Sequence, residues 1–228
     1  TSCSSENGAV LLDAVYDSAI DALERAGGVL LDAADKQRLH DVMFSGGKLT
    51  STLTAQSPAV IAERAKLQHP KAGAARFFMV EETGFGPSAP FSGEKLSPIL
   101  TVWRAANFQA AKELVGNVYS YQGAGHSVGL HTASSGSVME ERAADLAHDL
   151  PVARVIVNQA HAIATGGSFE NGLPFSLSMG CGTWGKNNFS DNMNYRHYLN
   201  TTRVVRPIAE KVPEVEDLLA NYFSQYPK

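Results

Sequence analysis

The sequence lacks the motifs of several common functional sites. It has two cysteines among 228 residues, Cys3 and Cys181, and no Cys-x-x-Cys pair. None of its seven histidines lies four residues from another, so no structural or catalytic metal site is expected. The chain contains no Walker-type phosphate loop; a Gly-x-Gly-x-x-Gly spacing occurs once, at 180–185, and a Gly-x-Ser-x-Gly spacing once, at 125–129. Neither spacing stands between a predicted strand and a predicted helix, so we expect no nucleotide-binding half and no serine hydrolase.

Charge and hydropathy argue against two further classes of partner. With 19 basic and 23 acidic residues the formal charge is −4, which indicates neither nucleic-acid binding nor a polybasic membrane patch. The apolar runs are too short for a membrane span. Residues 1–8 are polar and lack a basic region, so we expect no signal peptide. The scarcity of cysteine is typical of a reduced, cytoplasmic protein.

Strand and helix patterns alternate along the chain. Strands are predicted over 10–12, 29–31, 76–81, 99–104, 127–132 and 153–158, and helices over 16–25, 35–43, 57–66, 107–115, 137–147 and 215–223. Ser57-Pro58 and Asn107 are good helix starts. This alternation predicts an α/β fold, a three-layer sandwich with a mainly parallel sheet. Residues 159–194, rich in Gly, Ser and Asn, are too long for a passive connector and predict a binding loop or several turns.

Cys3 is the first candidate for chemistry. It lies among small hydroxyl residues in Thr1-Ser2-Cys3-Ser4-Ser5-Glu6-Asn7, at the start of the α/β pattern. Backbone N–H groups of a turn favour the thiolate, which is the reactive form of cysteine. The alternative is an N-terminal cysteine without a role. Cys181, between two glycines, is more typical of a small buried hydrophobe than of a second nucleophile.

His126 and Glu94 are the other candidates. His126 lies between Gly125 and Ser127, just before a predicted strand, and a histidine so placed can reach across a cleft. The alternative is a hydrogen-bonded structural histidine. Glu94 directly precedes an apolar strand, where a carboxylate can accept hydrogen bonds from a sugar diol. The alternative there is a solvated pair with Lys95.

Five separated motifs occur in a definite order. They are Cys3–Asn7, Gly93–Pro98, Gly125-His126, Met179–Asn187 and Arg196–Asn200. In order and approximate spacing they resemble the CoA-acylating aldehyde dehydrogenases, from Thr1 to about Pro207. The resemblance implies the aldehyde dehydrogenase catalytic subdomain over 1–207 and a C-terminal helical tail over 208–228. It also implies that the cofactor-binding half is absent from this chain.

The resemblance assigns a role to each candidate. Cys3 matches the nucleophile, which attacks the aldehyde to give a thiohemiacetal. Hydride loss to NAD or NADP then leaves a thioester on the sulfur, and coenzyme A takes the acyl group by thiol exchange. His126 matches a histidine that positions or deprotonates the thiols. Glu94 matches the glutamate that holds the nicotinamide ribose hydroxyls.

The resemblance also suggests the class of aldehyde. Residues 158–175 match the region that shapes the aldehyde pocket, where Ser168 and Asn171 suggest a polar or short substrate. The sequences of the motifs are most similar to those of acylating sulfoacetaldehyde dehydrogenases, and next to those of acylating succinate-semialdehyde dehydrogenases. An anionic substrate needs a basic partner. The candidates for that partner are Arg154, Lys186, Arg196 and Arg203.

Partners and alternatives complete these expectations. The family implies a cytoplasmic homo-oligomer, dimer or tetramer, with a bacterial microcompartment as a further location. The chain alone is expected to be inactive, because it needs the N-terminal cofactor domain. Two other hypotheses stay open: a hydrolytic aldehyde dehydrogenase that releases free acid, and a non-catalytic fragment that serves only in assembly.

Overall fold

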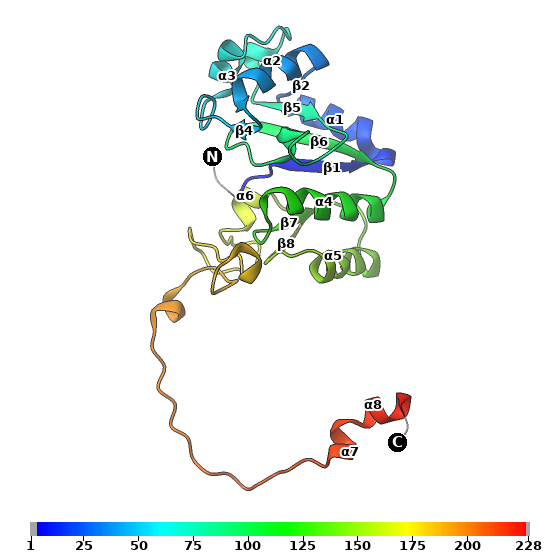
Figure 1. Ribbon diagram of the computed structural model, residues 1–228, viewed down its shortest axis with the longest axis vertical. Coiled ribbons are helices and arrows are strands. Elements are labelled where there is room, and N and C mark those ends of the chain that lie inside the picture. Colours follow the sequence, from blue (N-terminus) through cyan, green and yellow to red (C-terminus); the bar gives the residue numbers. More distant parts are fainter. Residues whose placement is uncertain (1–3, 227–228) are drawn as a thin grey trace. The chain divides into compact units, whose positions relative to one another are not determined.

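A four-stranded parallel sheet forms the centre of the fold (Figure 1). The computed structural model describes residues 4–226. The strand order is β1 (Gly8–Leu12), β6 (Ile99–Ala105), β5 (Phe77–Glu81) and β2 (Gly28–Leu30), and every neighbouring pair is parallel. Apolar residues dominate these strands, as expected of strands that are buried on both faces. The prediction of a mainly parallel sheet is confirmed.

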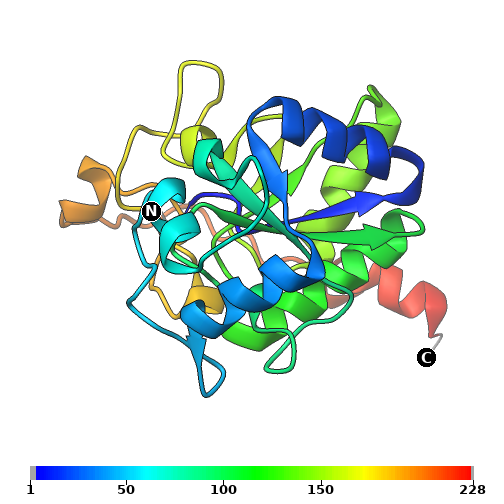
Figure 2. The same cartoon turned by 90° about the horizontal axis from the view of Figure 1, so that it is seen from above.

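Helices cover both faces of this sheet. Successive residues of a strand point to opposite faces, so Met79 packs toward α1 (Tyr16–Arg25), and Phe78 toward α2 (Ala33–Met43) and α3 (Pro58–Arg64). Figure 2 shows the strands between α1 and α2. The first cluster holds Tyr16, Ile20, Met79 and Val102, and the second includes Leu39, Ile61, Phe78 and Val80. The fold is therefore a three-layer α/β arrangement, as predicted.

A second, two-stranded parallel sheet carries the remaining core. It pairs β7 (Val128–Leu130) with β8 (Val155–Val157), beside α4 (Phe108–Gln122) and α5 (Ser137–Asp149). Its cluster consists of Val128, Leu130, Leu146, Leu150 and Val152. After β8 the chain forms α6 (His161–Ala164) and then runs irregularly to Asn194, interrupted by a short 3-10 turn. This long segment is the predicted run of several turns.

Two local features differ from the sequence prediction. An antiparallel hairpin joins β3 (Phe44–Ser45) to β4 (Lys48–Leu49). Its two central glycines have φ of 56° and 73°, which suits a two-residue turn that needs positive φ at both positions. Helix α4 continues to Gln122 instead of ending at 115, because the chain tolerates Gly116 within the helix and reverses only at Gly123, where φ is 103°.

Short 3-10 helices and a separate C-terminal unit complete the described chain. The 3-10 segments are Asp13–Val15, Ala72–Ala74, Pro90–Ser92, Thr183–Gly185 and Tyr195–Tyr198. The chain divides into one unit that ends at Asn194 and another that begins at Tyr195, before the expected boundary at 207. The second unit contains α7 (Val215–Leu218) and α8 (Ala220–Gln225) where one helix was predicted. Within residues 4–226, no helix is both long and apolar enough to cross a membrane.

Candidate active site

The segment that follows Cys3 connects the predicted site residues. Cys3 itself lies outside the described residues, which begin at Ser4. Ser4 is buried, with 4% of its surface exposed. The next two polar side chains, Glu6 and Asn7, each contact a different predicted part of the site.

Asn7 is hydrogen-bonded to the backbone on both sides of Glu94. Its Nδ2 donates to the Gly93 carbonyl at 2.8 Å, and its Oδ1 accepts from the Lys95 N–H at 3.2 Å. The Glu94 N–H donates to Oε1 of Gln122, at the end of α4, at 2.8 Å. The Glu94 side chain is exposed. The backbone at Glu94 is therefore held in place while its carboxylate is open to a ligand.

Lys95 is buried instead of forming the solvated pair with Glu94 that was the alternative interpretation. Its side chain is 0% exposed, and Nζ donates to the carbonyls of Phe91 at 2.8 Å and Gly93 at 3.0 Å. Burial lowers the pKa of Lys95 to about 7, although the carboxylates of Glu94 and Glu82 raise it. Sequence reasoning missed this residue, because a lysine beside a glutamate usually lies at the surface.

Glu6 links the same N-terminal segment to two histidines. Its Oε1 accepts from the backbone N–H of His161, the first residue of α6, at 2.8 Å. Nδ1 of His161 lies 3.4 Å from Oγ of Ser127, and that oxygen lies 2.9 Å from Nδ1 of His126. Glu6, His161, Ser127 and His126 thus form one continuous chain of polar contacts. The structure brings His126 into contact with residues that adjoin the N-terminal segment.

His161 was not predicted as a site residue. Its side chain is 8% exposed, and Oγ of Ser127 is its polar contact at the ring, 34 positions earlier in the chain. One signal was available: His161 follows the carboxyl end of β8, and ligands of α/β proteins bind beyond the carboxyl ends of parallel strands.

Both imidazoles are held neutral by their surroundings. Burial lowers the pKa of His126, and the nearby Arg154 and His161 lower it further. Burial also lowers the pKa of His161, an effect that the Glu6 carboxylate opposes in part. The Nε2 atom of each ring is buried without a hydrogen-bond partner in the described part of the chain. A neutral imidazole with a free nitrogen suits a proton acceptor.

The glycine-rich turn around Cys181 packs against the backbone just before His126. Gly125 has φ of 118°, and a Cβ there would lie 2.7 Å from the Gly185 nitrogen and 2.9 Å from the Cys181 carbonyl oxygen. The Cys181 N–H donates to Oδ1 of Asn187 at 2.8 Å. The turn therefore packs directly against the backbone that precedes His126 and restricts its position. Cys181 is half-buried, which is less buried than the small core residue we expected.

Arg154 holds the long loop in place. It is 7% exposed, and its Nη atoms donate to the Gly180 carbonyl at 2.9 Å and to Oδ1 of Asn192 at 2.8 Å. Of the other basic candidates, Lys186 is exposed, while Arg196 and Arg203 lie in the second unit. The guanidinium of Arg154 is thus engaged by the protein itself.

The polar residues of the predicted aldehyde loop are also engaged within the loop. Oγ of Ser168 accepts from the Glu170 N–H at 3.2 Å, and Nδ2 of Asn171 donates to the Ala164 carbonyl and to Oε1 of Gln159, both at 3.1 Å. A hollow of about 550 Å³ lies beside this loop. Its lining is largely apolar: Ala162, Ile163, Gly166, Gly167, Phe175, Ser176 and Leu177.

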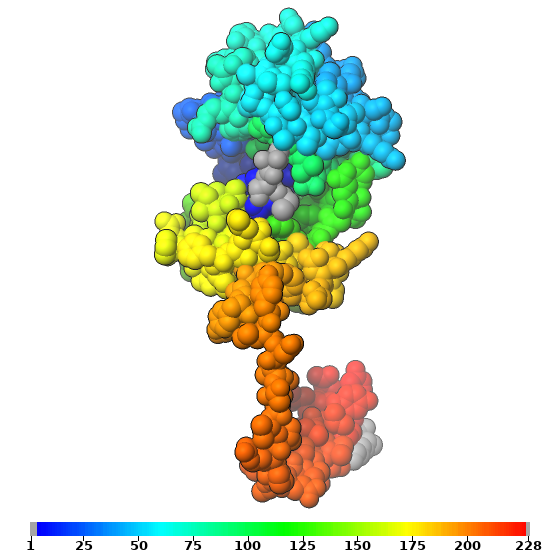
Figure 3. Space-filling model, turned by 90° about the vertical axis from the view of Figure 1, so that its left-hand side faces the viewer, coloured from blue at the N-terminus to red at the C-terminus, as the bar shows by residue number. Residues whose placement is uncertain are grey.

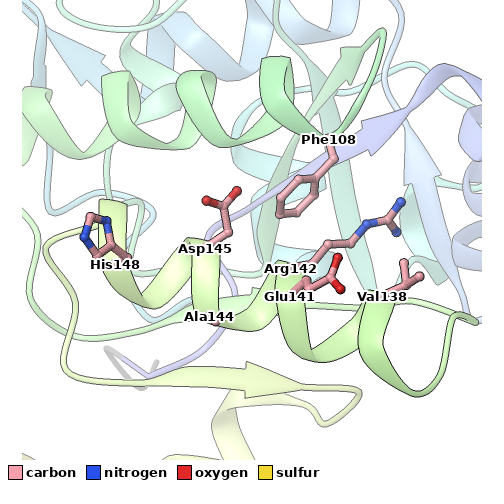
Figure 4. Close-up of a pocket in the computed structure, with 7 residues that line it drawn as sticks. All are labelled: Phe108, Val138, Glu141, Arg142, Ala144, Asp145 and His148. Atoms are coloured by element: carbon pink, nitrogen blue, oxygen red, sulfur yellow. The ribbon is translucent and has the colours of Figure 1, made fainter.

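Figures 3 and 4 show the regions of two hollows. In Figure 3 the loop that contains the 550 Å³ hollow is the yellow surface, and a recess separates it from the cyan surface of the sheet region. A different hollow, of about 610 Å³, lies along α5 beside the start of α4 (Figure 4). Its lining residues, Phe108, Val138, Glu141, Arg142, Ala144, Asp145 and His148, include none of the predicted site residues.

Comparisons with known proteins show what the chain is similar to in sequence and fold. No protein-family model matches the chain. The chain is 56% identical over all 228 residues to acylating sulfoacetaldehyde dehydrogenase of Cupriavidus necator, and it covers 45% of that protein. It is 31% identical to the acetylating succinate-semialdehyde dehydrogenase of Clostridium kluyveri, over 95% of the chain and 46% of that protein. An acetylating aldehyde dehydrogenase from Geobacillus thermoglucosidasius superposes with a TM-score of 0.82 at 29% identity, over 94% of this chain and 46% of that one. The chain therefore spans just under half the length of these relatives.

Proposed function

We propose that this chain, which matches part of the CoA-acylating aldehyde dehydrogenases in sequence and fold, is the catalytic portion of such an enzyme. The activity is the NAD(P)-dependent oxidation of a short anionic aldehyde to an acyl-CoA. One observation carries the proposal: Asn7 contacts the segment that holds Glu94, and Glu6 contacts His161, whose ring reaches His126 through Ser127. Three peptide units separate Cys3 from Glu6, a span of at most about 11 Å.

The chemistry follows from the residues of this chain. His126 accepts the proton of the Cys3 thiol at Nε2, because its imidazole is neutral and that nitrogen has no partner in the described residues. The Cys3 thiolate adds to the aldehyde carbon, and the sulfur later carries the acyl group as a thioester until the thiol of coenzyme A takes it. Glu94, whose backbone is fixed and whose carboxylate is exposed, fits the diol of a ribose. NAD(P), when bound, supplies the hydride acceptor.

The relatives support the class of aldehyde. The names of two of them specify sulfoacetaldehyde and succinate semialdehyde, which are both short and anionic. We do not assign the substrate anion to Arg154, because its Nη atoms already bind the loop. We further propose a cytoplasmic homo-oligomer that is completed by an N-terminal cofactor-binding half.

Substitution of the nucleophile tests the proposal. In the full-length enzyme, Cys3→Ala should abolish the formation of NADH and acyl-CoA from aldehyde plus coenzyme A, because no thioester can form. Cys181→Ala is the matched control and should retain activity, because it keeps the Cβ that packs in the turn. Turnover that survives Cys3→Ala would overturn the proposal. Release of free acid that is independent of coenzyme A would favour the hydrolytic alternative instead.

A further inference from the structure

The buried His161 and the half-buried His126 share one serine hydroxyl. Oγ of Ser127 lies 2.9 Å from Nδ1 of His126 and 3.4 Å from Nδ1 of His161. A hydroxyl has one proton to donate, so it can donate to only one of these two nitrogens. The other Nδ1 must then carry its own proton and donate to the serine oxygen. The two neutral rings therefore have opposite tautomers, in one of two arrangements.

The proposed function selects between the two arrangements. In it, Nε2 of His126 takes the thiol proton, so that nitrogen carries a lone pair and the ring proton of His126 lies on Nδ1. Nδ1 of His161 then accepts from the serine hydroxyl, and the serine oxygen accepts from Nδ1–H of His126.

Each arrangement places one proton on a buried Nε2 that has no partner among the described residues: on His161 in the selected arrangement, and on His126 in the opposite one. The surrounding backbone holds the His161 ring in place: a Cβ at Gly129 would lie 2.8 Å from Nε2 of His161, and Glu6 binds the His161 N–H.

We infer that His161 is a positioning residue that acts through Ser127 to keep His126 protonated at Nδ1 and free at Nε2. This inference rests on the proposed function, in which Nε2 of His126 takes the thiol proton. A free imidazole prefers the proton on Nε2. Without the hydrogen bonds through Ser127 to His161, His126 would therefore present an N–H to the thiol instead of a lone pair. In a histidine, the partner of one ring nitrogen fixes the state of the other.

The tautomer can be measured without catalysis. In the folded protein labelled with ¹⁵N-histidine, at pH 8, we expect His126 to show a protonated Nδ1 and an unprotonated Nε2 in long-range ¹H–¹⁵N spectra, with its signals assigned from His126→Gln. Ser127→Ala should move the proton to Nε2, whereas Ser127→Thr, which keeps the hydroxyl, should not. His161→Leu should also move the proton. His161→Asn, whose amide oxygen lies near the position of Nδ1, should not.

Two results would overturn the inference. One is an Nε2-protonated His126 in the unsubstituted protein, and the other is an unchanged tautomer in both Ser127→Ala and His161→Leu. If Ser127→Ala or His161→Leu fails to fold, as judged from its amide spectrum, the other substitution, its control variant and the unsubstituted protein still decide the question.

Kinetics separate this inference from the proposed function. In the full-length enzyme, Ser127→Ala should lower kcat at pH 7 by about 10- to 100-fold, a part of what a general base contributes, with little change in KM for the aldehyde. Ser127→Thr should restore the rate. If the tautomer shifts as expected and the rate does not change, the proton-accepting role of His126 fails while the hydrogen-bond chain stands. If His126 is protonated at Nε2, the inference fails whatever the rate.

Discussion

The sheet region and the loop region of the first unit bury different kinds of side chain. The four-stranded sheet centres on residues with no exposed surface, among them Phe78 and Val102, and all of its largest clusters are apolar. The loop region after β8 packs instead around Arg154, which directly precedes β8, and around Asn192, which is 0% exposed. Asn192 accepts from Arg154 at 2.8 Å and donates to the carbonyls of Thr165 at 2.9 Å and Pro174 at 2.8 Å.

This difference shows that the sheet region provides stability, whereas the loop region fixes the geometry of the site. Burial of apolar surface is non-directional, so the sheet needs only the correct alternation of residue types. A buried amide or guanidinium must meet particular carbonyls at hydrogen-bond distance, because an unpaired one costs free energy. The loop region can therefore hold irregular backbone in one shape, and it is this region that contains His161 and supports the segment before His126.

Removal of a core side chain should have the largest effect on stability. Phe78→Ala should lower the free energy of unfolding by about 3–5 kcal/mol, from lost transfer energy and the cavity that remains. Because the sheet is the common core, circular dichroism and tryptophan fluorescence should report one shifted urea transition. Phe169→Ala is the matched control, since Phe169 is 98% exposed, and it should change stability by less than about 0.5 kcal/mol. Equal effects of the two variants would contradict the assignment of the core.

Removal of the loop amide should have a smaller and local effect. Asn192→Ala deletes three hydrogen bonds and leaves a donor of Arg154 unpaired, a cost of about 2–4 kcal/mol. Hydrogen exchange should accelerate at the amides of Gly180 and Met193, which bond across the loop, while the amides of β5 and β6 stay protected.

Exposed Asn188 provides the control for this experiment. Asn188→Ala should leave the exchange rates of the loop unchanged. If Asn192→Ala instead weakens β5 and β6 as much as the loop, then the two regions unfold as one unit and the comparison between them fails.

The same difference between regular apolar patterns and particular polar contacts explains which parts of the fold the sequence predicts. Helix α1 was predicted from residue 16 to 25, as observed, because its apolar residues recur with helical spacing and two glycines follow it. Ser57 and Asn107 cap α3 and α4 as expected, and each accepts a backbone N–H three residues on. The hairpin at Gly46 was missed, since its strands have two residues each and show no periodicity.

Prediction of the site was possible only in part. Glu94, His126 and Cys3 were assigned through motif resemblance and stay predictions, and Cys3 lies outside the described residues. His161 and Lys95 were not predicted. Their partners are backbone groups and a hydroxyl that is 34 residues away in sequence from His161, and no local spacing encodes such contacts.

Lys95 is a buried polar side chain within the otherwise apolar sheet region. Its titration therefore refines the comparison between the sheet region and the loop region. Burial lowers its pKa from 10.5 to about 7, so between these values the unfolded chain binds a proton that the folded protein does not. Stability should therefore rise with pH across this window. Relative to Lys95→Met, which cannot titrate, the unsubstituted protein should gain about 2 kcal/mol between pH 7 and pH 9, measured by urea unfolding at both pH values.

Lys95→Met should also fold well, because it leaves no carbonyl without a donor. The Phe91 carbonyl still accepts from Oγ1 of Thr101 at 2.6 Å, and the Gly93 carbonyl still accepts from Nδ2 of Asn7 at 2.8 Å. Lys48→Met, at an exposed position of β4, is the control and should keep the pH dependence of the unsubstituted protein. If Lys95→Met keeps it as well, the ammonium of Lys95 is not desolvated in the folded state, and the sheet region is less uniformly apolar than its clusters indicate.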